Sequence, residues 1–162
     1  MVFLIECLVC IVIFTVMVVS LCNSDPLNFL PNFPPKLVER LKDLGIVKDE
    51  KKSKSAYIRK GVACIIIVIV LSYILIRINK ADTFLKGFLL SYGLWLVVDW
   101  YDALVLDCLW FCHNKKVRFK GTEDLIDEYQ NYSFHIMQSV KGMLLGLPLC
   151  LIIGLIVNFF GK

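Results

Sequence analysis

The chain has 162 residues, of which 58% are hydrophobic and 20% are charged, and its mean hydropathy is +0.72. A soluble domain is about 45–50% apolar and cannot bury a larger share in one small core, so the excess predicts a protein of the lipid bilayer. The formal net charge of +4 is modest, and the basic residues fall in polar connections between apolar runs, which argues against a nucleic-acid partner.

Four apolar runs predict an all-α membrane protein with four transmembrane helices, at about residues 2–21, 62–78, 83–110 and 134–160. About twenty residues rising 1.5 Å each match a hydrocarbon core of roughly 30 Å. The first run is interrupted only by Glu6. It lacks the preceding basic residues and the following small-residue cleavage site of a secretory signal peptide, so we interpret it as a span. Residues 1–162 then form one integral membrane domain.

The basic residues predict the orientation of these spans. The polar connections at about residues 22–61 and 111–133 hold nine and four lysines and arginines. By the positive-inside rule both connections are cytoplasmic. We therefore expect a multi-pass protein of the cell membrane with its N-terminus and C-terminus outside. Only four basic residues fall on the outer side: Arg77, Lys80, Lys86 and Lys162.

The first connection is predicted to have three parts. The prolines of "PLNFLPNFPP" remove donors and constrain their neighbours, so this part is not expected to run as a helix. The stretch "PKLVERLKDLG" predicts a short amphipathic helix that starts at Pro35 and stops at Gly45. We expect this helix to lie on the inner leaflet, with docking to a protein partner as the alternative. "KDEKKSKSAYIRK" reads as a solvated linker that touches anionic headgroups. The apolar stripe of the helix is Leu37, Val38, Leu41 and Leu44.

The third span carries three aspartates and ends near a histidine. At about 100° per residue, Asp99, Asp102 and His113 share one side of a helix, with Asp107 at its edge. Charged groups in hydrocarbon are costly, so this side should face protein or a water-filled cavity.

The fourth span has a matching polar side, on which His135, Gln138, Ser139 and the glycines lie. Its small residues also permit close helix packing. Antiparallel alignment of the two spans places Asp107 near His135 and Gln138, Asp102 near Lys141 and Gly142, and Asp99 beside the glycines. We expect one polar pocket near the cytoplasmic surface, formed by Asp99, Asp102, Asp107, His113, His135, Gln138 and Lys141.

Three interpretations of this pocket stay open. In the first, the polar pairs fix the helix register of a membrane scaffold or partner-binding subunit. In the second, the carboxylates bind or relay a cation or proton, which would require oligomerisation. In the third, a divalent metal at the pocket serves an enzyme that acts on lipid or isoprenoid headgroups. The sequence favours the non-catalytic role, with the bilayer and a protein partner or second copy as its contacts. The metal ligands would be Asp99, Asp102, Asp107, His113 and His135.

The cysteines and the segment that begins at Gly121 carry two further local signals. The seven cysteines are odd in number and lie mostly in apolar runs, so they predict no disulfide framework. Gly121 followed by Thr122, Glu123 and Asp124 predicts a loop that ends in a helix N-cap with acidic residues in the first turn.

At "DALVLDCLWFCH", "GTED" and "YSFH" the sequence resembles small membrane proteins of low-GC Gram-positive bacteria. The resemblance spans most of the chain. It implies a four-helix membrane protein and no particular activity.

Overall fold

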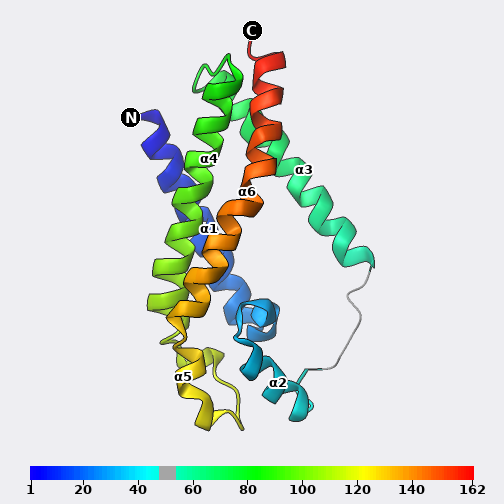
Figure 1. Cartoon of the computed structure of the whole chain (residues 1–162), viewed down its shortest axis with the longest axis vertical. Helices are drawn as coiled ribbons and strands as arrows, with labels where there is room; N and C mark the ends of the chain where they lie inside the picture. The colour runs from blue at the N-terminus through cyan, green and yellow to red at the C-terminus, as the bar shows by residue number, and fades with distance from the viewer. Residues whose placement is uncertain (48–53) are drawn as a thin grey trace. The chain divides into compact units, whose positions relative to one another are not determined.

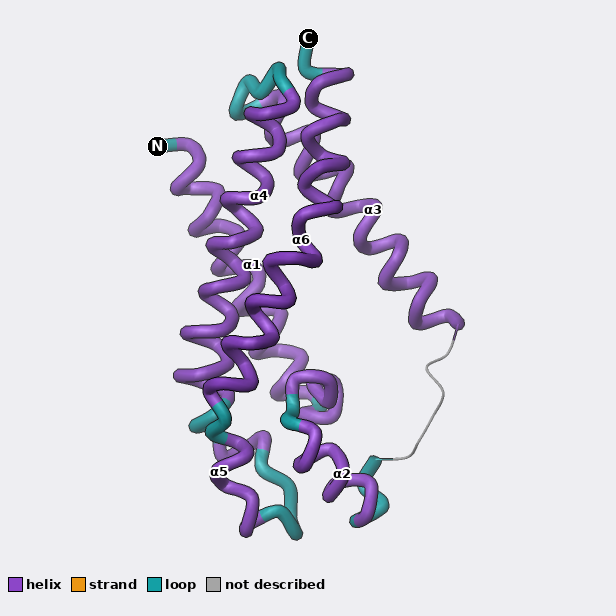
Figure 2. The backbone as a smooth tube through the Cα atoms, in the orientation of Figure 1, coloured by secondary structure: helices purple, strands orange, loops and turns teal. Residues whose placement is uncertain are grey.

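Every regular element in the described part of the chain is a helix. The computed structural model describes residues 1–47 and 54–162, and neither range contains a strand (Figure 2). The predicted all-α fold is therefore confirmed. The α-helices of these ranges (Figure 1) are α1 Val2–Ser24, α2 Pro35–Asp43, α3 Lys54–Arg77, α4 Phe84–Tyr101, α5 Ile126–Tyr129 and α6 Tyr132–Phe160.

Shorter elements join or extend these helices. A π-helix, Asp102–Phe111, continues α4, and 3₁₀ helices cover Pro26–Asn32, Lys115–Val117 and Glu123–Leu125. Residues 48–53 of the predicted charged linker lie outside the described residues. In the remainder of that linker α3 has already begun, at Lys54.

Three helices are long and apolar enough to cross a membrane: Val2–Ser24, Phe84–Phe111 and Tyr132–Phe160. They coincide with the first, third and fourth predicted spans. The second predicted span corresponds to a shorter apolar helix, Gly61–Arg77, within α3.

The chain divides into two compact units, whose boundary falls inside α1, α4 and α6. In its described residues the first unit comprises residues 1–9, 54–98 and 141–162. The second comprises residues 10–47 and 99–140. Both predicted connections therefore fall largely within the second unit.

In the first unit, Trp95 of α4 packs against Gly142 and Gly146 of α6, which together are called the glycine groove. The indole of Trp95 lies so close to Gly146 that a Cβ there would clash with Nε1. The same Nε1 donates a hydrogen bond to the carbonyl of Gly142 at 3.1 Å. The close packing expected of the glycines is thus confirmed at this site. A second contact gives Glu6 a partner, because the Asn79 amide donates to its carboxylate at 2.6 Å.

The second unit is organised around an apolar cluster that α2 helps to build. Leu37 and Leu41 are both 0% exposed, so these two leucines of the predicted stripe contact protein and not a membrane surface. Two ion pairs link α2 to residues 118–131: Lys36 with Glu128 at 2.7 Å, and Arg40 with Asp124 at 2.9 Å. The buried members of the cluster are Cys22, Phe33, Leu37, Phe111, Val117 and Tyr129.

Local backbone features set both ends of α2. Pro35 is its first residue, where a missing amide is harmless. After Leu44, Gly45 takes a φ of +69°, which favours glycine. The amides of Gly45 and Ile46 donate to the carbonyls of Lys42 and Leu41, at 2.8 and 3.0 Å, and so close a Schellman motif.

The proline-rich segment was predicted wrongly as non-helical. Pro26–Asn32 forms a 3₁₀ helix, interrupted at Phe29. The short i→i+3 pattern tolerates prolines at its start, and the Asp25 carboxylate accepts a hydrogen bond from the Leu27 amide at 2.9 Å.

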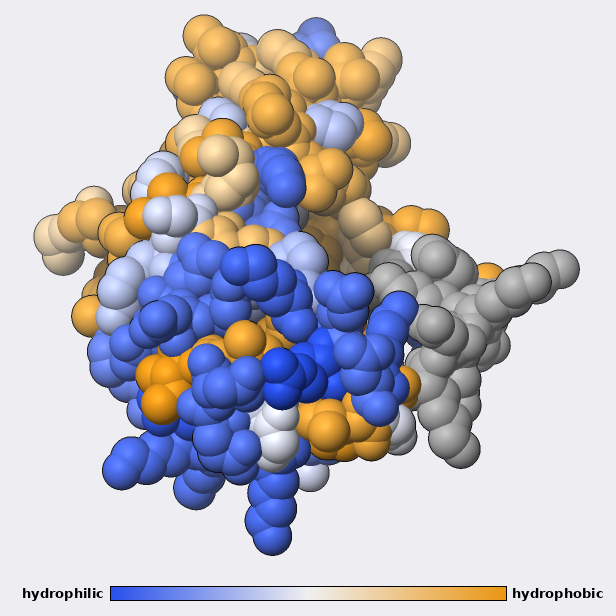
Figure 3. Space-filling model, turned by 60° about the horizontal axis from the view of Figure 1, so that its bottom comes forward, coloured by the Kyte–Doolittle hydropathy of each residue, from blue (hydrophilic) through white to orange (hydrophobic). Residues whose placement is uncertain are grey.

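The outer surface of these connections is polar. Figure 3 shows hydrophilic side chains gathered over this face, with smaller apolar patches between them. Exposed residues of the connections include Lys36, Glu39, Lys115, Lys116, Lys120 and Glu123.

We predict that Gly146→Ala destabilises the protein, because the new methyl group meets the Trp95 indole. Overpacking of this kind costs about 1–3 kcal/mol. Gly61→Ala is the matched control, since a Cβ there has no atom within 4 Å. Thermal unfolding in detergent should show a lower midpoint for Gly146→Ala and an unchanged or higher one for Gly61→Ala. Equal midpoints would contradict the glycine groove.

We predict that Leu37→Ala lowers the free energy of unfolding by about 2–5 kcal/mol, the usual effect of emptying a buried leucine site. Leu44→Ala, in the same segment, should cost clearly less because Leu44 is 44% exposed. Denaturant unfolding in detergent measures both. A Leu37→Ala variant as stable as Leu44→Ala would show that α2 does not contribute to the core.

Candidate functional site

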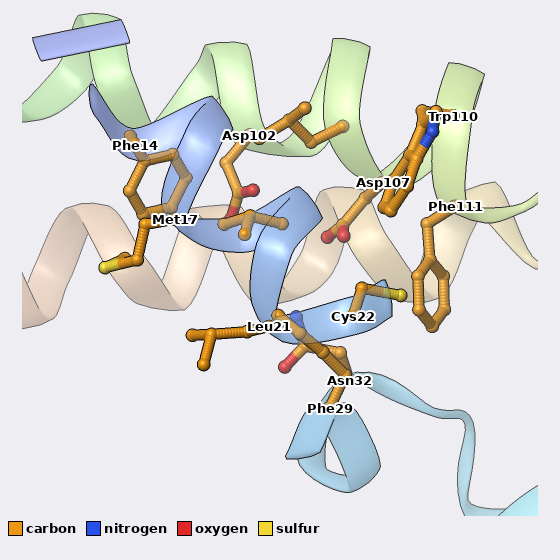
Figure 4. A pocket seen from close by; sticks show the side chains of 12 residues that line it. Phe14, Met17, Leu21, Cys22, Phe29, Asn32, Asp102, Asp107, Trp110 and Phe111 are labelled. Atoms are coloured by element: carbon orange, nitrogen blue, oxygen red, sulfur yellow. The ribbon is translucent and has the colours of Figure 1, made fainter. Parts of the chain in front are cut away.

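The candidate site is built on the π-helix. Its hydrogen bonds run between residues five apart, as from the Cys112 amide to the Asp107 carbonyl at 2.9 Å. Such segments are rare and often occur at functional sites. Because positions five apart come to the same side, Asp102 and Asp107 both face one pocket, and Figure 4 shows the two carboxylates pointing the same way. The predicted edge position of Asp107 was wrong because it assumed α-helical spacing.

Asp107 pairs with His135 of α6, as the sequence predicts. His135 Nδ1 lies 3.0 Å from Asp107 Oδ2, and the His135 side chain is only 1% exposed. The rings of Phe111 and Phe134 meet the imidazole edge-on, with centroids 6.0 and 5.5 Å away. Donation from Nδ1 leaves Nε2 as the second polar atom of the ring. Nε2 is buried and has no hydrogen-bond partner among the described residues.

Asp99 pairs with Ser139, whereas the sequence predicted that Asp99 lies beside the glycines of α6. The Ser139 hydroxyl donates to Asp99 Oδ2 at 2.5 Å. Asp99 and Asp107 are eight residues apart, whereas their partners Ser139 and His135 are four apart. The π-helix takes up more residues per turn than an α-helix, so the simple antiparallel register cannot hold along this segment.

The pocket between these residues has a volume of about 340 Å³. Its lining includes three carboxylates and no lysine or arginine. Within the described residues the Asp102 carboxylate has neither a hydrogen bond nor an ion pair, so it is the acid left free to bind. The pocket is lined by Pro31, Asn32, Asp99, Asp102, Ala103, Asp107, His135, Gln138 and Ser139.

Five of the seven predicted site residues line the pocket, and two do not. His113 is exposed, and its ring stacks on Tyr132. Its nitrogens are bound by the carbonyl of Cys108 and the hydroxyl of Tyr132, each at 3.2 Å. Lys141 belongs to the first unit and is exposed. Pro31 and Asn32 also line the pocket, and the sequence did not predict them. They belong to a 3₁₀ helix, and hydrophobic periodicity does not predict how such a helix packs against other helices.

The predicted divalent-metal set is not assembled. Across residues 1–47 and 54–162, no three histidine, cysteine, aspartate or glutamate side chains are grouped so that they could hold a metal ion. His113 lies apart from the aspartates because Tyr132 and Cys108 hold its ring.

The "GTED" motif folds into a structural corner. Thr122 stands at the predicted N-cap position, but its hydroxyl donates to the Phe119 carbonyl at 2.6 Å and contacts the Tyr129 hydroxyl at 2.9 Å. Glu123 accepts a hydrogen bond from the Gly121 amide at 2.9 Å. Hydrogen bonds from the backbone amides of Glu123 and Gly121 hold the pKa of the Glu123 carboxyl below its ordinary value. The motif therefore stabilises the connection through local hydrogen bonds, and its residues do not line the acidic pocket.

Comparisons with protein-family models, curated proteins and solved structures find no match to this chain. The chemistry of the site therefore rests on its side chains.

We predict that Asp107 and His135 are energetically coupled. Replacing either partner leaves a buried polar group unpaired, at about 1–3 kcal/mol, so Asp107→Ala and His135→Phe should each lower the unfolding free energy. Together they should cost less than the sum of the single changes, by about 0.5–3 kcal/mol. His113→Ala serves as the exposed control. Strict additivity of the two changes in denaturant unfolding would argue against the pair.

Proposed function

We propose that this chain is a four-span membrane protein that binds a positively charged group without transforming it. Both termini are outside, and the two basic connections are cytoplasmic. The observation that carries the proposal is the Asp102 carboxylate, which has no partner among the described residues and lies in a pocket that holds two further acids.

Exposure along α3 supports the fourth span. The apolar helix Gly61–Arg77 has 17 residues by its bounds, within the range of about 17–25 for a membrane helix. Four isoleucines in the first half of this helix are exposed by 54% or more, as suits a helix surrounded by lipid. Arg77 lies over the ring of Tyr73, with 6.0 Å from Cζ to the ring centroid, which fits a polar anchor at its end. The isoleucines concerned are Ile65, Ile66, Ile67 and Ile69.

Contacts within the first unit support the placement of the termini. Glu6 near the N-terminus binds Asn79, in the connection between α3 and α4. Gly161 near the C-terminus lies against the carbonyl of Ala81 in the same connection. The two ends thus gather at one connection, as an even number of crossings requires. In the second unit, the ion pairs between α2 and residues 118–131 join the two basic connections, which suits a common cytoplasmic side.

The chemistry of the pocket supports an organic cation as the ligand. Two of its carboxylates already accept a hydrogen bond or ion pair, from Ser139 and His135. Within residues 1–47 and 54–162, Asp102 has neither a hydrogen-bond donor nor a counter-charge. An ammonium group supplies both, and charge-assisted hydrogen bonds are the stronger kind. The absence of a metal-ligand group among the described residues favours this ligand over a metal-assisted enzyme.

The proposal predicts that the purified protein in lipid nanodiscs binds ethylammonium. Asp102→Asn should weaken binding at least tenfold, because an amide cannot supply the negative charge that pairs with an ammonium group. Glu39→Gln, which removes an exposed carboxylate from α2, should leave the affinity unchanged. Isothermal titration calorimetry measures the three affinities.

Two results would contradict the proposal. One is a parent protein that does not bind ethylammonium, or an Asp102→Asn variant that binds it equally well. The other is Asp102-dependent flux of ethylammonium or protons through reconstituted vesicles, which would make the chain a transporter.

A further inference from the structure

A second, apolar pocket adjoins the acidic one. Its volume is about 150 Å³, and it is lined mainly by residues of α1 and the π-helix, with Phe29 of the 3₁₀ helix. Figure 4 shows the side chains that line it and the helices from which they come. The apolar lining includes Phe14, Met17, Leu21, Phe29, Trp110 and Phe111.

The two pockets share part of their walls. Asn32, Asp102 and Asp107 line both of them. A ligand held by the free Asp102 carboxylate therefore has an acidic space on one side and an apolar space on the other. The π-helix creates this arrangement, because it turns Asp102 and Asp107 to the side on which Trp110 and Phe111 also lie.

The buried Nε2 atom of His135 indicates that the acidic pocket binds a ligand. His135 lines this pocket, is 1% exposed, and its Nε2 has no partner among the described residues. Buried polar atoms are nearly always satisfied by protein, water or ligand. Because Nδ1 is taken up by Asp107, Nε2 is the ring atom that remains for a polar group of a ligand or for a water bound with it.

Resting on the proposed function, we propose that the ligand is a small organic ammonium ion that carries an apolar group about the size of a benzene ring. The ammonium group binds Asp102, and the apolar group fills the pocket beside it. An apolar cavity of about 150 Å³ in another protein holds one benzene molecule. The larger acidic pocket leaves room for the charged end with bound water.

The test compares two ammonium ions that differ in the apolar group. 2-Phenylethylammonium and ethylammonium are titrated against the parent protein in phosphatidylcholine nanodiscs. We expect 2-phenylethylammonium to bind at least tenfold more tightly, since a single methylene in an apolar pocket is already worth about 10-fold or more. 2-Phenylethanol, which lacks the charge, should bind at least tenfold more weakly than 2-phenylethylammonium.

Two variants of α1 locate the apolar group. Met17→Trp places a larger side chain at the apolar pocket and should remove the advantage of the phenyl group while ethylammonium still binds. Retained ethylammonium binding also shows that the variant folds. Val16→Trp is the matched control, because Val16 is 61% exposed and lines neither pocket, and it should keep the advantage.

The outcomes separate this inference from the proposed function. Equal affinity for the two ammonium ions would overturn the inference and leave the cation-binding function standing. Binding of neither ion would overturn both. Displacement of 2-phenylethylammonium by phosphatidylethanolamine in the nanodisc would make the guest a lipid headgroup and overturn the size limit proposed for it.

Discussion

The aspartates of residues 99–107 impose the constraint on which the second unit depends. A carboxylate inside an apolar helix is costly unless it is paired or in contact with water. Asp99 and Asp107 meet this condition through Ser139 and His135. Both partners belong to α6, so the polar side of α6 must face the π-helix. Asp102 is left facing the pocket, and the pocket follows from the two pairs that are made.

Phe111 connects this pocket with the connecting segments. It belongs to the apolar cluster that includes Leu37 and Tyr129, it meets the His135 ring edge-on, and it lines the apolar pocket. The packing of the two connections and the shape of the apolar pocket therefore depend on the same side chain. Substitutions in α2 are expected to reach the site through this ring.

The sequence predicted the parts of the structure that depend on local pattern. Apolar length located the three helices that are long and apolar enough to cross a membrane. Pro35 and Gly45 mark the ends of α2, because a missing amide and a left-handed φ have local causes. Opposing polar faces were enough to bring Asp107 to His135. The π-helix was not predictable in this way, since its sequence satisfies α-helical periodicity equally well. Asn32 was missed because its place depends on how a 3₁₀ turn packs.

In the function proposed above, Asp102 is the free acid of a cation site, and this role can be tested at the carboxyl group itself. Its most direct test is the ¹³C carboxyl resonance of Asp102 in nanodiscs, followed by solid-state NMR as ethylammonium is added, with Asp82, which is bound to Lys86, as the reference. Binding at the pocket predicts that the Asp102 resonance moves with saturation while that of Asp82 stays in place. An Asp102 resonance that does not move, or that moves only in step with Asp82, would contradict the claim.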